Sequence, residues 1–347
     1  MKTVRDAAQT RVLVTGATGT IGRHVVTELV ARGYQVRALT SKPVVEASVS
    51  DSLEWRQLDF HESLDFDPLV EGCAAVLHLG AEVSLRSDRM QRSNVDATYA
   101  IAEASERAGV RVFCYTSSVA VYGNSRRRRV SEDSPVLTTE RDVPSEYWAF
   151  DELRCYGRTK LQGELAIGAV AHNVEYVILR PTVVVDIQDL IALGDLSKAE
   201  KRRAGSRHAH NIYVYDVADA ILWFMERALN REVPSPGLSK FNLSEDSIKV
   251  DTYGKIFKAA YEATGDRKWR VTAIPWPVEW IWSLLKFHSL PPRQCFGRMI
   301  FMEDKLREVG YTTPYGITRA VADFCDKLAS TDTGGLQGHD RLTNFRR

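Results

Sequence analysis

The chain has 347 residues, with 46 Lys and Arg against 45 Asp and Glu and 44% hydrophobic residues. This length exceeds the usual single-domain size and predicts a main domain with a smaller lobe. A formal net charge of +1 gives no overall field for nucleic acid or an anionic membrane. No apolar run approaches the roughly 18 residues of a membrane span, so we expect neither nucleic acid nor a membrane as partner.

The first half of the chain alternates apolar and amphipathic segments, which is typical of an α/β fold with a doubly wound parallel sheet. Strands are predicted over 11–15, 35–39, 54–58, 74–79, 111–116 and 174–180, and helices over 20–32, 88–108 and 151–171. We predict a main domain from 1–180, to which 206–230 return, and a smaller discontinuous lobe from 181–205 and 231–329. The Gly- and Thr-rich tail 330–347 is expected to be mobile.

A glycine-rich turn follows the first predicted strand and precedes the first helix, with the sequence T-G-A-T-G-T-I-G over 15–22. Gly16 permits a tight turn, Gly19 lets the backbone approach a pyrophosphate, and Gly22 allows close helix-strand packing. The following helix offers unpaired N–H groups to an anion. The alternative is a structural turn without a ligand; a phosphate loop of the nucleoside-triphosphatase type is excluded, because no Gly-Lys-Ser/Thr follows at the required spacing.

Tyr156 and Lys160 are four residues apart on a predicted helix, so both side chains lie on one face within reach of each other. A phenol has a pKa of about 10, and a nearby positive charge favours phenolate, so the pair predicts a general acid/base whose pKa is lowered. The alternative is an exposed helix face on which this spacing arises by chance.

Further motifs occur in the order expected for one known family. They are His78-Leu79-Gly80-Ala81, Asn94-Val95-Asp96-Ala97-Thr98, Thr116-Ser117-Ser118-Val119-Ala120-Val121-Tyr122-Gly123 and Leu179-Arg180-Pro181-Thr182. With the glycine turn and Y-x-x-x-K, they make the chain resemble the extended short-chain dehydrogenase/reductase superfamily over most of its length. This resemblance implies a Rossmann-type nucleotide domain, a substrate lobe, and a homodimer formed by the helices near 88–108 and 151–171.

The resemblance also implies roles for individual residues. Ser118 would hydrogen-bond the reacting oxygen, Tyr156 would transfer its proton, and Lys160 would lower the phenol pKa and bind the nicotinamide ribose. Asn94 would support the catalytic site, or only bond to nearby backbone. The implied cofactor-binding residues, besides Tyr156 and Lys160, are Gly16, Thr18, Gly19, Thr20, Ile21, Gly22, Arg23, Ser41, Lys42, Asp59, Phe60, Leu79, Gly80, Ala81, Thr116, Pro181, Thr182 and Val183. No metal site is predicted.

The choice of cofactor depends on the end of the second strand, where an acidic residue would bind the ribose of NAD. The chain reads R-A-L-T-S-K over 37–42 and has no acid there. Ser41 and Lys42 suit a 2′-phosphate, and Arg23 could add a second positive group, so NADP(H) is favoured over NAD(H). Alternatively, both cations are solvated surface charges. Asp59 is placed near the adenine or acts as a helix cap.

We therefore predict an NADP-dependent oxidoreductase acting on a secondary alcohol or ketone, with a nucleotide-sugar epimerase retaining NAD as the alternative. A dinucleotide-sensing regulatory protein without turnover is the alternative from another class. Val119 and Ala120 replace the Asp-Glu pair of 4,6-dehydratases, and the diphosphate-binding Asn and Arg of the epimerases are missing unless Arg207 substitutes.

Two segments concern the substrate. The aromatic residues of 275–285 indicate lobe core or a pocket for an aromatic or lipophilic ligand. Arg126–Arg129 indicate a solvated loop or a lid that recognises an anionic substrate.

Five cysteines, at 73, 114, 155, 295 and 325, form no C-x-x-C pair and have an odd count. With the short polar segment 1–10, they predict a cytoplasmic protein.

Overall fold

The computed structural model describes residues 7–43, 51–84, 86–123, 125, 127–137, 151–232, 237–246, 252–287 and 299–331. Its centre is a seven-stranded sheet with the order β10-β7-β5-β4-β1-β2-β3, in which every neighbouring pair is parallel. The strands are β1 (Arg11–Thr15), β2 (Gln35–Thr40), β3 (Leu53–Gln57), β4 (Ala75–His78), β5 (Val112–Thr116), β7 (Glu175–Pro181) and β10 (Leu238–Leu243). The predicted α/β class with a doubly wound parallel sheet is confirmed.

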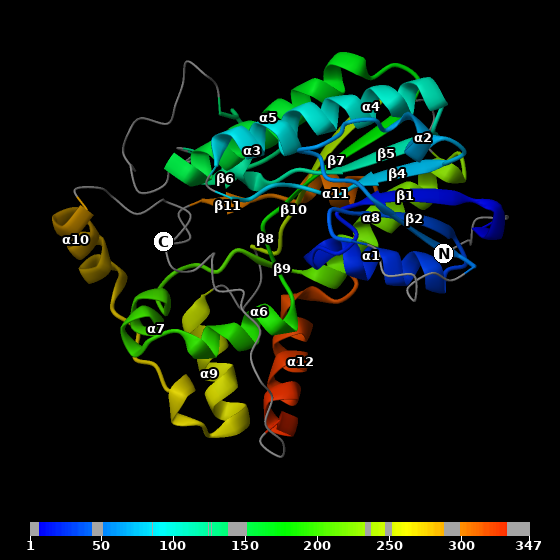
Figure 1. The fold of residues 1–347 in the computed structure, drawn as a ribbon. Coiled ribbons are helices and arrows are strands. Elements are labelled where there is room, and N and C mark those ends of the chain that lie inside the picture. The colour runs from blue at the N-terminus through cyan, green and yellow to red at the C-terminus, as the bar shows by residue number, and fades with distance from the viewer. Residues whose placement is uncertain are drawn as a thin grey trace.

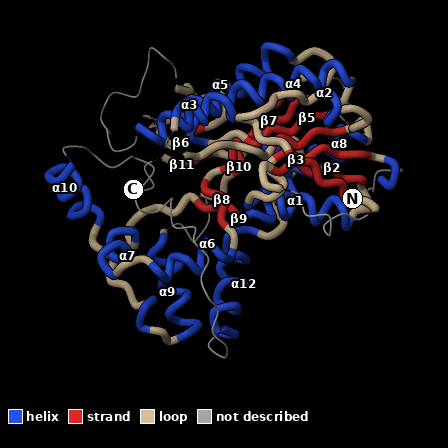
Figure 2. Tube along the Cα trace, viewed as in Figure 1, coloured by secondary structure: helices blue, strands red, loops and turns tan. Residues whose placement is uncertain are grey.

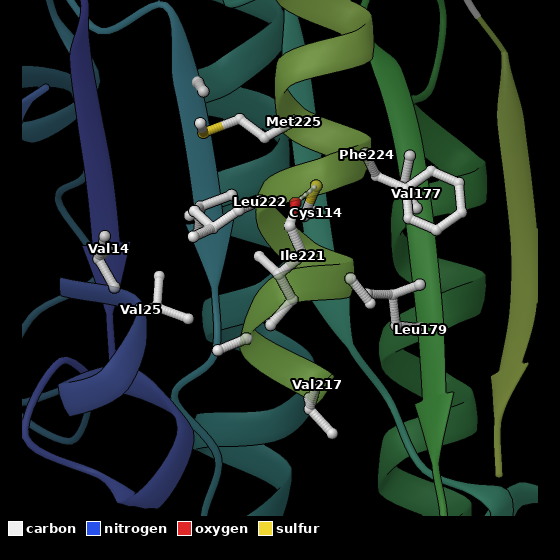
Figure 3. Close-up of a cluster of buried hydrophobic side chains, with 14 of the residues drawn as sticks. Val14, Val25, Cys114, Val177, Leu179, Val217, Ile221, Leu222, Phe224 and Met225 are labelled. Atoms are coloured by element: carbon white, nitrogen blue, oxygen red, sulfur yellow. Dashed lines mark hydrogen bonds between the residues drawn. The ribbon is translucent and has the colours of Figure 1, made fainter. Parts of the chain in front are cut away.

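Helices cover both faces of this sheet, with α1 and α8 on one side and α2 to α5 on the other (Figures 1 and 2). Their apolar faces pack on the strands in two separate buried clusters. Figure 3 shows the first cluster, where Val217, Ile221 and Met225 of α8 lie over the strands. The helices are α1 (Thr20–Ala31), α2 (Asp67–Val70), α3 (Ser87–Gln91), α4 (Ala97–Ala108), α5 (Asp151–Val170) and α8 (Val214–Leu229).

The strand order places the reversal of the sheet between β1 and β4, because β2 lies on one side of β1 and β4 on the other. In open α/β sheets a crevice forms at such a reversal, outside the carboxyl ends of the strands, and ligands bind there. The glycine-rich turn follows β1 and the segment His78–Ala81 follows β4. The topology therefore brings these two predicted cofactor segments to the same edge.

A smaller lobe packs below the carboxyl edge of the sheet around its own buried cluster, which includes Trp269, Phe257 and Phe324 (Figure 1). It carries the parallel pair β8 (Val183–Val185) and β9 (Asn211–Tyr213), and a second pair joins β6 (Arg129–Val130) to β11 (Ile300–Phe301). The remaining helices are α6 (Ile187–Ala192), α7 (Lys198–Ala204), α9 (Tyr253–Thr264), α10 (Trp276–Phe287), α11 (Asp304–Glu308) and α12 (Gly316–Thr331).

The boundary of the lobe differs from the sequence expectation. Residues 231–329 were assigned to the lobe, but β10 within this range pairs in parallel with β7 and forms the edge of the central sheet. Leu306 and Tyr311, near α11, are also buried in the core shared by the sheet and α8. The chain thus returns to the main domain a second time after α8. The pairing of β10 with β7 joins strands far apart in the sequence, so no local sequence pattern predicts it. The tail from 332 onward lies outside the described residues.

The aromatic residues of 275–285 do not form lobe core. Trp276 and Trp282 on α10 are 44% and 36% exposed, while Glu279 on the same helix is 1% exposed. The Glu279 carboxylate pairs with the guanidinium of Arg207, and the Arg203 guanidinium lies 4.3 Å from the ring centroid of Trp282. Charged contacts thus help to hold α10. The expectation of a buried aromatic core is wrong for Trp276 and Trp282, while Trp280 is half-buried.

Two buried carboxylates fix the beginning of α12. The Asp216 carboxylate accepts the N–H groups of Tyr315 and Gly316, each at 2.8 Å, and the Glu245 carboxylate accepts the N–H of Ile317 at 2.5 Å. Negative charge at a helix N-terminus is favourable, but burial opposes it. Burial, helped by the nearby Asp216, raises the pKa of Glu245 to about 7.

This raised pKa predicts a pH-dependent stability. The folded chain binds the Glu245 proton more tightly than the unfolded chain does, so the free energy of unfolding falls as pH rises from about 4.5 to about 7. Glu245→Gln keeps an acceptor oxygen and cannot ionise, so we expect it to stabilise the protein at about pH 8 by up to about 3 kcal/mol. Urea unfolding at several pH values measures this, with the exposed Glu262→Gln as control. Equal or lower stability of Glu245→Gln at pH 8 would contradict the account.

Among the described helices, none combines the length and apolar composition that crossing a bilayer requires.

Candidate active site

The glycine turn after β1 has no space for side chains. Gly16 has φ +63°, and a Cβ atom there would lie 2.6 Å from the amide nitrogen of Gly80. A Cβ on Gly22 would overlap the carbonyl oxygen of Gly16. The turn is therefore packed backbone against backbone, between the end of β1, the start of α1 and the segment after β4, and the roles predicted for Gly16 and Gly22 agree with this packing.

The N-terminus of α1 faces the same edge without a side-chain cap. Its N-cap residue is Gly19, which has no side chain to accept a hydrogen bond from the first turn. The first N–H groups of a helix have no intrahelical partner, and they create a positive end that favours an anion. Thr18 is exposed and Thr20 and Ile21 are half-buried in this turn. The backbone N–H groups of this turn could therefore hold a phosphate group.

Thr15 joins the glycine turn to the segment after β4. Its hydroxyl oxygen accepts the N–H groups of Leu79 at 3.1 Å and Gly80 at 3.0 Å. The hydroxyl has one proton, and the third neighbour is Nδ1 of His78 at 2.8 Å. The Thr15 hydroxyl therefore donates to His78, and Nδ1 is the acceptor nitrogen of that ring.

His78 continues this chain of hydrogen bonds toward the catalytic helix. Its Nε2 lies 3.0 Å from the hydroxyl of Thr98, and that hydroxyl donates to the carbonyl oxygen of Asn94 at 2.8 Å. Nε2 therefore carries the ring proton. Burial, with the charge of nearby Lys160, lowers the pKa of His78 to about 3, so the imidazole is neutral and its tautomer is fixed by its two neighbours.

Asn94 is a positioning residue. It lies in a π-helical turn (Arg92–Asp96) that interrupts the predicted helix 88–108 between α3 and α4. Its side-chain amide accepts the N–H of Glu82 at 2.8 Å and donates to the Glu82 carbonyl at 2.9 Å and to the hydroxyl of Thr159 at 3.1 Å. Asn94 thus ties the loop after β4 to α5, within one turn of Tyr156 and Lys160.

Ser118 and Tyr156 are brought together as predicted. Ser118 begins the short 3₁₀ turn after β5, and its hydroxyl oxygen accepts the N–H of Ala120 at 3.1 Å. A hydrogen bond from the Ser118 side chain acts to lower the pKa of Tyr156, but burial outweighs it and raises this pKa to about 12. The expectation that Lys160 lowers the phenol pKa is wrong for the chain itself, because desolvation of the phenolate is the larger effect.

Lys160 is 1% exposed, one turn after Tyr156 on α5. Its Nζ lies 4.2 Å from the ring centroid of Tyr115 on β5, in a cation-π contact. Burial lowers the pKa of Lys160 to about 7, while the carboxylate of Glu164 acts in the opposite direction. The Lys160 ammonium is thus buried away from water and is stabilised by the ring of Tyr115 and by the carboxylate of Glu164.

Glu164, one further turn along α5, is the centre of a buried polar network that the sequence analysis missed. It is bidentate to Arg180, with Nε to Oε1 at 2.8 Å and Nη2 to Oε2 at 2.6 Å. It also accepts the hydroxyl of Ser117 at 2.6 Å, and Lys240 lies 3.4 Å away. The spacing Y-x-x-x-K-x-x-x-E places all three side chains on one helix face, and this signal was readable in the sequence.

The end of β2 leaves the predicted phosphate-binding residues exposed. Ser41 and Lys42 are exposed, and among the described residues the Lys42 ammonium makes no ion pair. Arg37 instead is buried, with Nε 3.0 Å from the Glu54 carboxylate. Arg23 pairs with Asp186, the N-cap of α6, so its charge is already offset within the chain.

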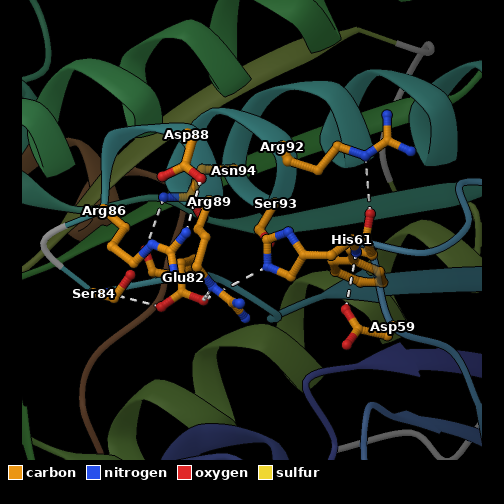
Figure 4. A network of polar contacts seen from close by, with 11 residues as sticks. Asp59, His61, Glu82, Ser84, Arg86, Asp88, Arg89, Arg92, Ser93 and Asn94 are labelled. Atoms are coloured by element: carbon orange, nitrogen blue, oxygen red, sulfur yellow. Dashed lines mark hydrogen bonds and ion pairs between the residues drawn. The ribbon is translucent and has the colours of Figure 1, made fainter.

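The loops after β3 and β4 form a polar rim at the carboxyl edge (Figure 4). The carboxylate of Asp59 accepts the N–H of His61 at 2.9 Å, and the imidazole of His61 lies 3.8 Å from the Glu82 carboxylate. Phe60 packs edge-on against Phe66, with ring centroids 5.5 Å apart. The Asp59 carboxylate thus stabilises its own turn. No helix begins there, so the helix-cap alternative is wrong, and the place near the adenine stays a prediction.

Two buried hydroxyls at the same edge have no hydrogen-bond partner among the described residues: Thr116 Oγ1 at the end of β5 and Thr182 Oγ1 after β7. Pro181 is buried, Val183 is 47% exposed, and Ala81 is exposed beside them. Unpaired buried hydroxyls are costly and call for a partner. Together with the cradle that a Cβ would fill at Gly16, they fit a bound dinucleotide with its phosphates at α1.

The remaining sequence predictions concern the Arg126–Arg129 segment. Arg129 lies in β6, and its guanidinium is 3.7 Å from the carboxylate of Asp304. Arg126 and the stretch 138–150 lie outside the described residues, so the lid hypothesis stays a prediction.

Comparison with known proteins gives consistent matches. The model of the NAD-dependent epimerase/dehydratase family matches residues 12–185. The chain is 33% identical over 192 residues to a Synechocystis protein provisionally named dihydroflavonol 4-reductase, covering 51% of this chain and 50% of that protein. It is 23% identical over 334 residues to a decarboxylating sterol-4-alpha-carboxylate 3-dehydrogenase of Dictyostelium discoideum, covering 87% and 95%. The chain thus spans about half the length of the Synechocystis relative.

The fold also matches solved structures. A short-chain dehydrogenase/reductase superfamily protein from Agrobacterium tumefaciens with bound NAD superposes with a TM-score of 0.68 and 21% identity, covering 93% of this chain and 100% of that one. At this identity the likeness supports the fold alone.

Proposed function

Because the chain belongs to the NAD-dependent epimerase/dehydratase family, we propose that it is an NADP-dependent oxidoreductase acting on a secondary alcohol or ketone. The observation that carries this proposal is the group of Ser118, Tyr156 and Lys160 at the carboxyl edge of the sheet. The Tyr156 phenol is hydrogen-bonded to Ser118, and the buried Lys160 lies one helical turn away. A phenol beside a hydroxyl and a buried cation suits proton transfer to an oxygen.

The proposed mechanism assigns one task to each side chain. A bound nicotinamide dinucleotide would supply or accept the hydride. The Ser118 hydroxyl accepts the N–H of Ala120 and is hydrogen-bonded to the Tyr156 phenol, and it would donate its proton to a substrate oxygen bound beside them. With a pKa of about 12, Tyr156 is a neutral proton donor at physiological pH. The neutral phenol therefore favours the reductive direction, in which Tyr156 protonates the alkoxide that forms on the substrate.

NADP is proposed as the cofactor on the basis of Ser41 and Lys42. They end the second strand with a hydroxyl and an ammonium where NAD-dependent folds use an acid. Arg23 contributes less than the sequence suggested, because Asp186 already pairs with it.

Lys42→Ala is expected to lower the affinity for NADPH by about 10-fold, since a charge-assisted phosphate contact contributes about 1.5 kcal/mol. The affinity for NADH should not change, because NADH has no 2′-phosphate. Fluorescence titration of both nucleotides measures this, with the exposed Lys258→Ala as control. Equal loss for NADH and NADPH, or no loss, would remove Lys42 from the proposed phosphate site.

A small ketone is favoured over a nucleotide sugar as substrate. Arg207, the one candidate for the missing diphosphate contact, donates to the buried Glu279 carboxylate at 2.8 Å. Its charge is thus used within the chain to hold α10. The names of the dihydroflavonol reductase and sterol-carboxylate dehydrogenase relatives favour an alicyclic or aromatic ketone. The nucleotide-sugar epimerase with retained NAD stays as the alternative, since it would use the same three residues.

We also propose a homodimer through α4 and α5, and a cytoplasmic location. Tyr99 on α4 and Leu165 on α5 are 41% and 61% exposed. These two helices pack together on one face of the sheet (Figure 1), and exposed large apolar side chains there suit a subunit contact.

Identification of the bound nucleotide tests the proposal. Freshly purified protein is denatured, and any released dinucleotide is identified. The emptied protein is then titrated with NADH and NADPH. Little released nucleotide and tighter NADPH binding support a reductase that exchanges its cofactor. Retained NAD would overturn it in favour of the epimerase, and NADPH-dependent partner binding without turnover of any ketone would favour the sensor.

A further inference from the structure

Three potential metal-ligand side chains meet away from the candidate catalytic residues. His208 and His210 come just before β9, and Asp246 follows β10. One ligand atom from each residue lies within 4.8 Å of the others. No motif in the sequence predicted this group, because 36 residues separate His210 from Asp246.

The distances within this cluster are close to those between the ligands of a small cation. Nδ1 of His210 lies 2.8 Å from Oδ1 of Asp246, and Nε2 of His208 lies 3.5 Å from the same oxygen. Zinc bonds to nitrogen and oxygen are about 2.0 to 2.2 Å long, so neighbouring ligand atoms of a tetrahedral site are about 3.3 Å apart. The observed distances lie on both sides of this value, and a small adjustment of side chains accommodates the ion.

The surrounding structure orients the Asp246 carboxylate and holds the backbone of His210. The second carboxylate oxygen of Asp246 accepts the N–H of Phe301 at 2.8 Å, which turns Oδ1 toward the imidazoles. The carbonyl of His210 accepts the N–H of Val183 at 2.9 Å. His210 also has φ +43°, a left-handed conformation that is unfavourable for a residue with a Cβ. Outer partners of this kind fix the ligands of metal sites.

The environment is dry but reachable. The side chains of His208, His210 and Asp246 are 9%, 8% and 2% exposed. A cavity of about 230 Å³ reaches Asp246 and Phe301. The two arginines that line the cavity, Arg129 and Arg307, pair with Asp304 and Glu303, which offsets their charge. The cavity thus reaches the carboxylate side of the cluster, while the two histidines do not line it.

We propose that His208, His210 and Asp246 bind one divalent cation of the Zn²⁺ type. Two imidazoles and one carboxylate are ligands that zinc accepts, and three protein ligands leave a fourth position for water. The ion joins the segment before β9 to the end of β10, and so fastens the lobe to the central sheet. In the alternative, the three side chains are held by hydrogen bonds alone.

The test uses the full chain without a polyhistidine tag, dialysed against a chelator and titrated with Co²⁺ as a spectroscopic probe. We expect one equivalent to bind with the visible ligand-field bands of a tetrahedral nitrogen and oxygen site, and Zn²⁺ to displace it. His208→Gln and Asp246→Asn should each weaken binding by at least about 100-fold, since even outer partners contribute 10- to 100-fold. His172→Gln, at an exposed histidine between α5 and β7, is the matched control and should bind normally.

Three results would overturn the proposal. They are the absence of stoichiometric binding in the wild-type protein, bands that persist unchanged in both variants, and a thiolate charge-transfer band that assigns the ion to cysteines. If a variant does not fold, the wild-type protein decides. Zn²⁺ should then raise its unfolding midpoint in proportion to the logarithm of the concentration, and an unchanged midpoint contradicts the site.

Discussion

Tyr156→Phe is expected to lower kcat by about 10²- to 10⁴-fold, the usual contribution of a general acid/base. The substitution removes one hydroxyl and leaves the ring in place. Because the ring stays in place and only the hydroxyl is lost, the affinity for NADPH should stay within about 2-fold, a change of less than 0.5 kcal/mol. The substitution removes the hydrogen bond between the neutral phenol and Ser118, so the loss of folding stability should stay near about 1 kcal/mol.

The measurement follows NADPH consumption with a panel of alicyclic and aromatic ketones, using whichever ketone the wild-type protein reduces best. Tyr99→Phe is the matched control. It keeps the ring that the proposed subunit contact would use and removes a hydroxyl that, among the described residues, bonds Glu103 at 3.4 Å. Full activity of Tyr156→Phe would remove the tyrosine from the chemistry. Loss of NADPH binding together with kcat would assign it to the cofactor pocket alone.

The sequence predicted those parts of the fold whose signal is local. Strands of a parallel sheet are buried on both faces, so they appear as short continuous apolar runs, and all six predicted strands occur within one residue at each end. The glycine turn was readable because a backbone that touches Gly80 excludes any Cβ at Gly16. The Tyr156 and Lys160 pair was readable because helical spacing fixes which side chains share a face.

The parts that the sequence did not predict depend on contacts between distant segments. The π-helical turn at Asn94 exists because its amide bonds to Glu82 and Thr159, which no helical pattern contains. The pKa of Tyr156 depends on burial, and burial is a property of the assembled site. The sequence pattern gave the wrong direction for the shift in the Tyr156 pKa, because it included the positive charge of Lys160 and not the desolvation of the phenol.

Glu164→Gln is expected to lower the free energy of unfolding by about 3 to 5 kcal/mol, the usual cost of removing one member of a buried ion pair. Glu164 and Arg180 are 0% and 2% exposed, and the guanidinium would keep its charge in a site without a counter-ion. Denaturant unfolding measures the loss. Glu103→Gln is the matched control, because its pair with Arg107 is about half exposed and should contribute no more than about 0.5 kcal/mol.

A loss below about 1 kcal/mol would show that water or a neighbouring group replaces the carboxylate. The double substitution Glu164→Leu with Arg180→Met separates charge from packing: it removes both charges, so it should recover much of the lost stability. The same carboxylate also opposes the fall in the pKa of Lys160. Glu164→Gln should therefore lower that pKa further, and NADPH affinity should decline with rising pH earlier than in the wild-type protein. Glu164 thus links the stability of the sheet and α5 to the charge at the catalytic lysine, two properties that the control at Glu103 leaves unchanged.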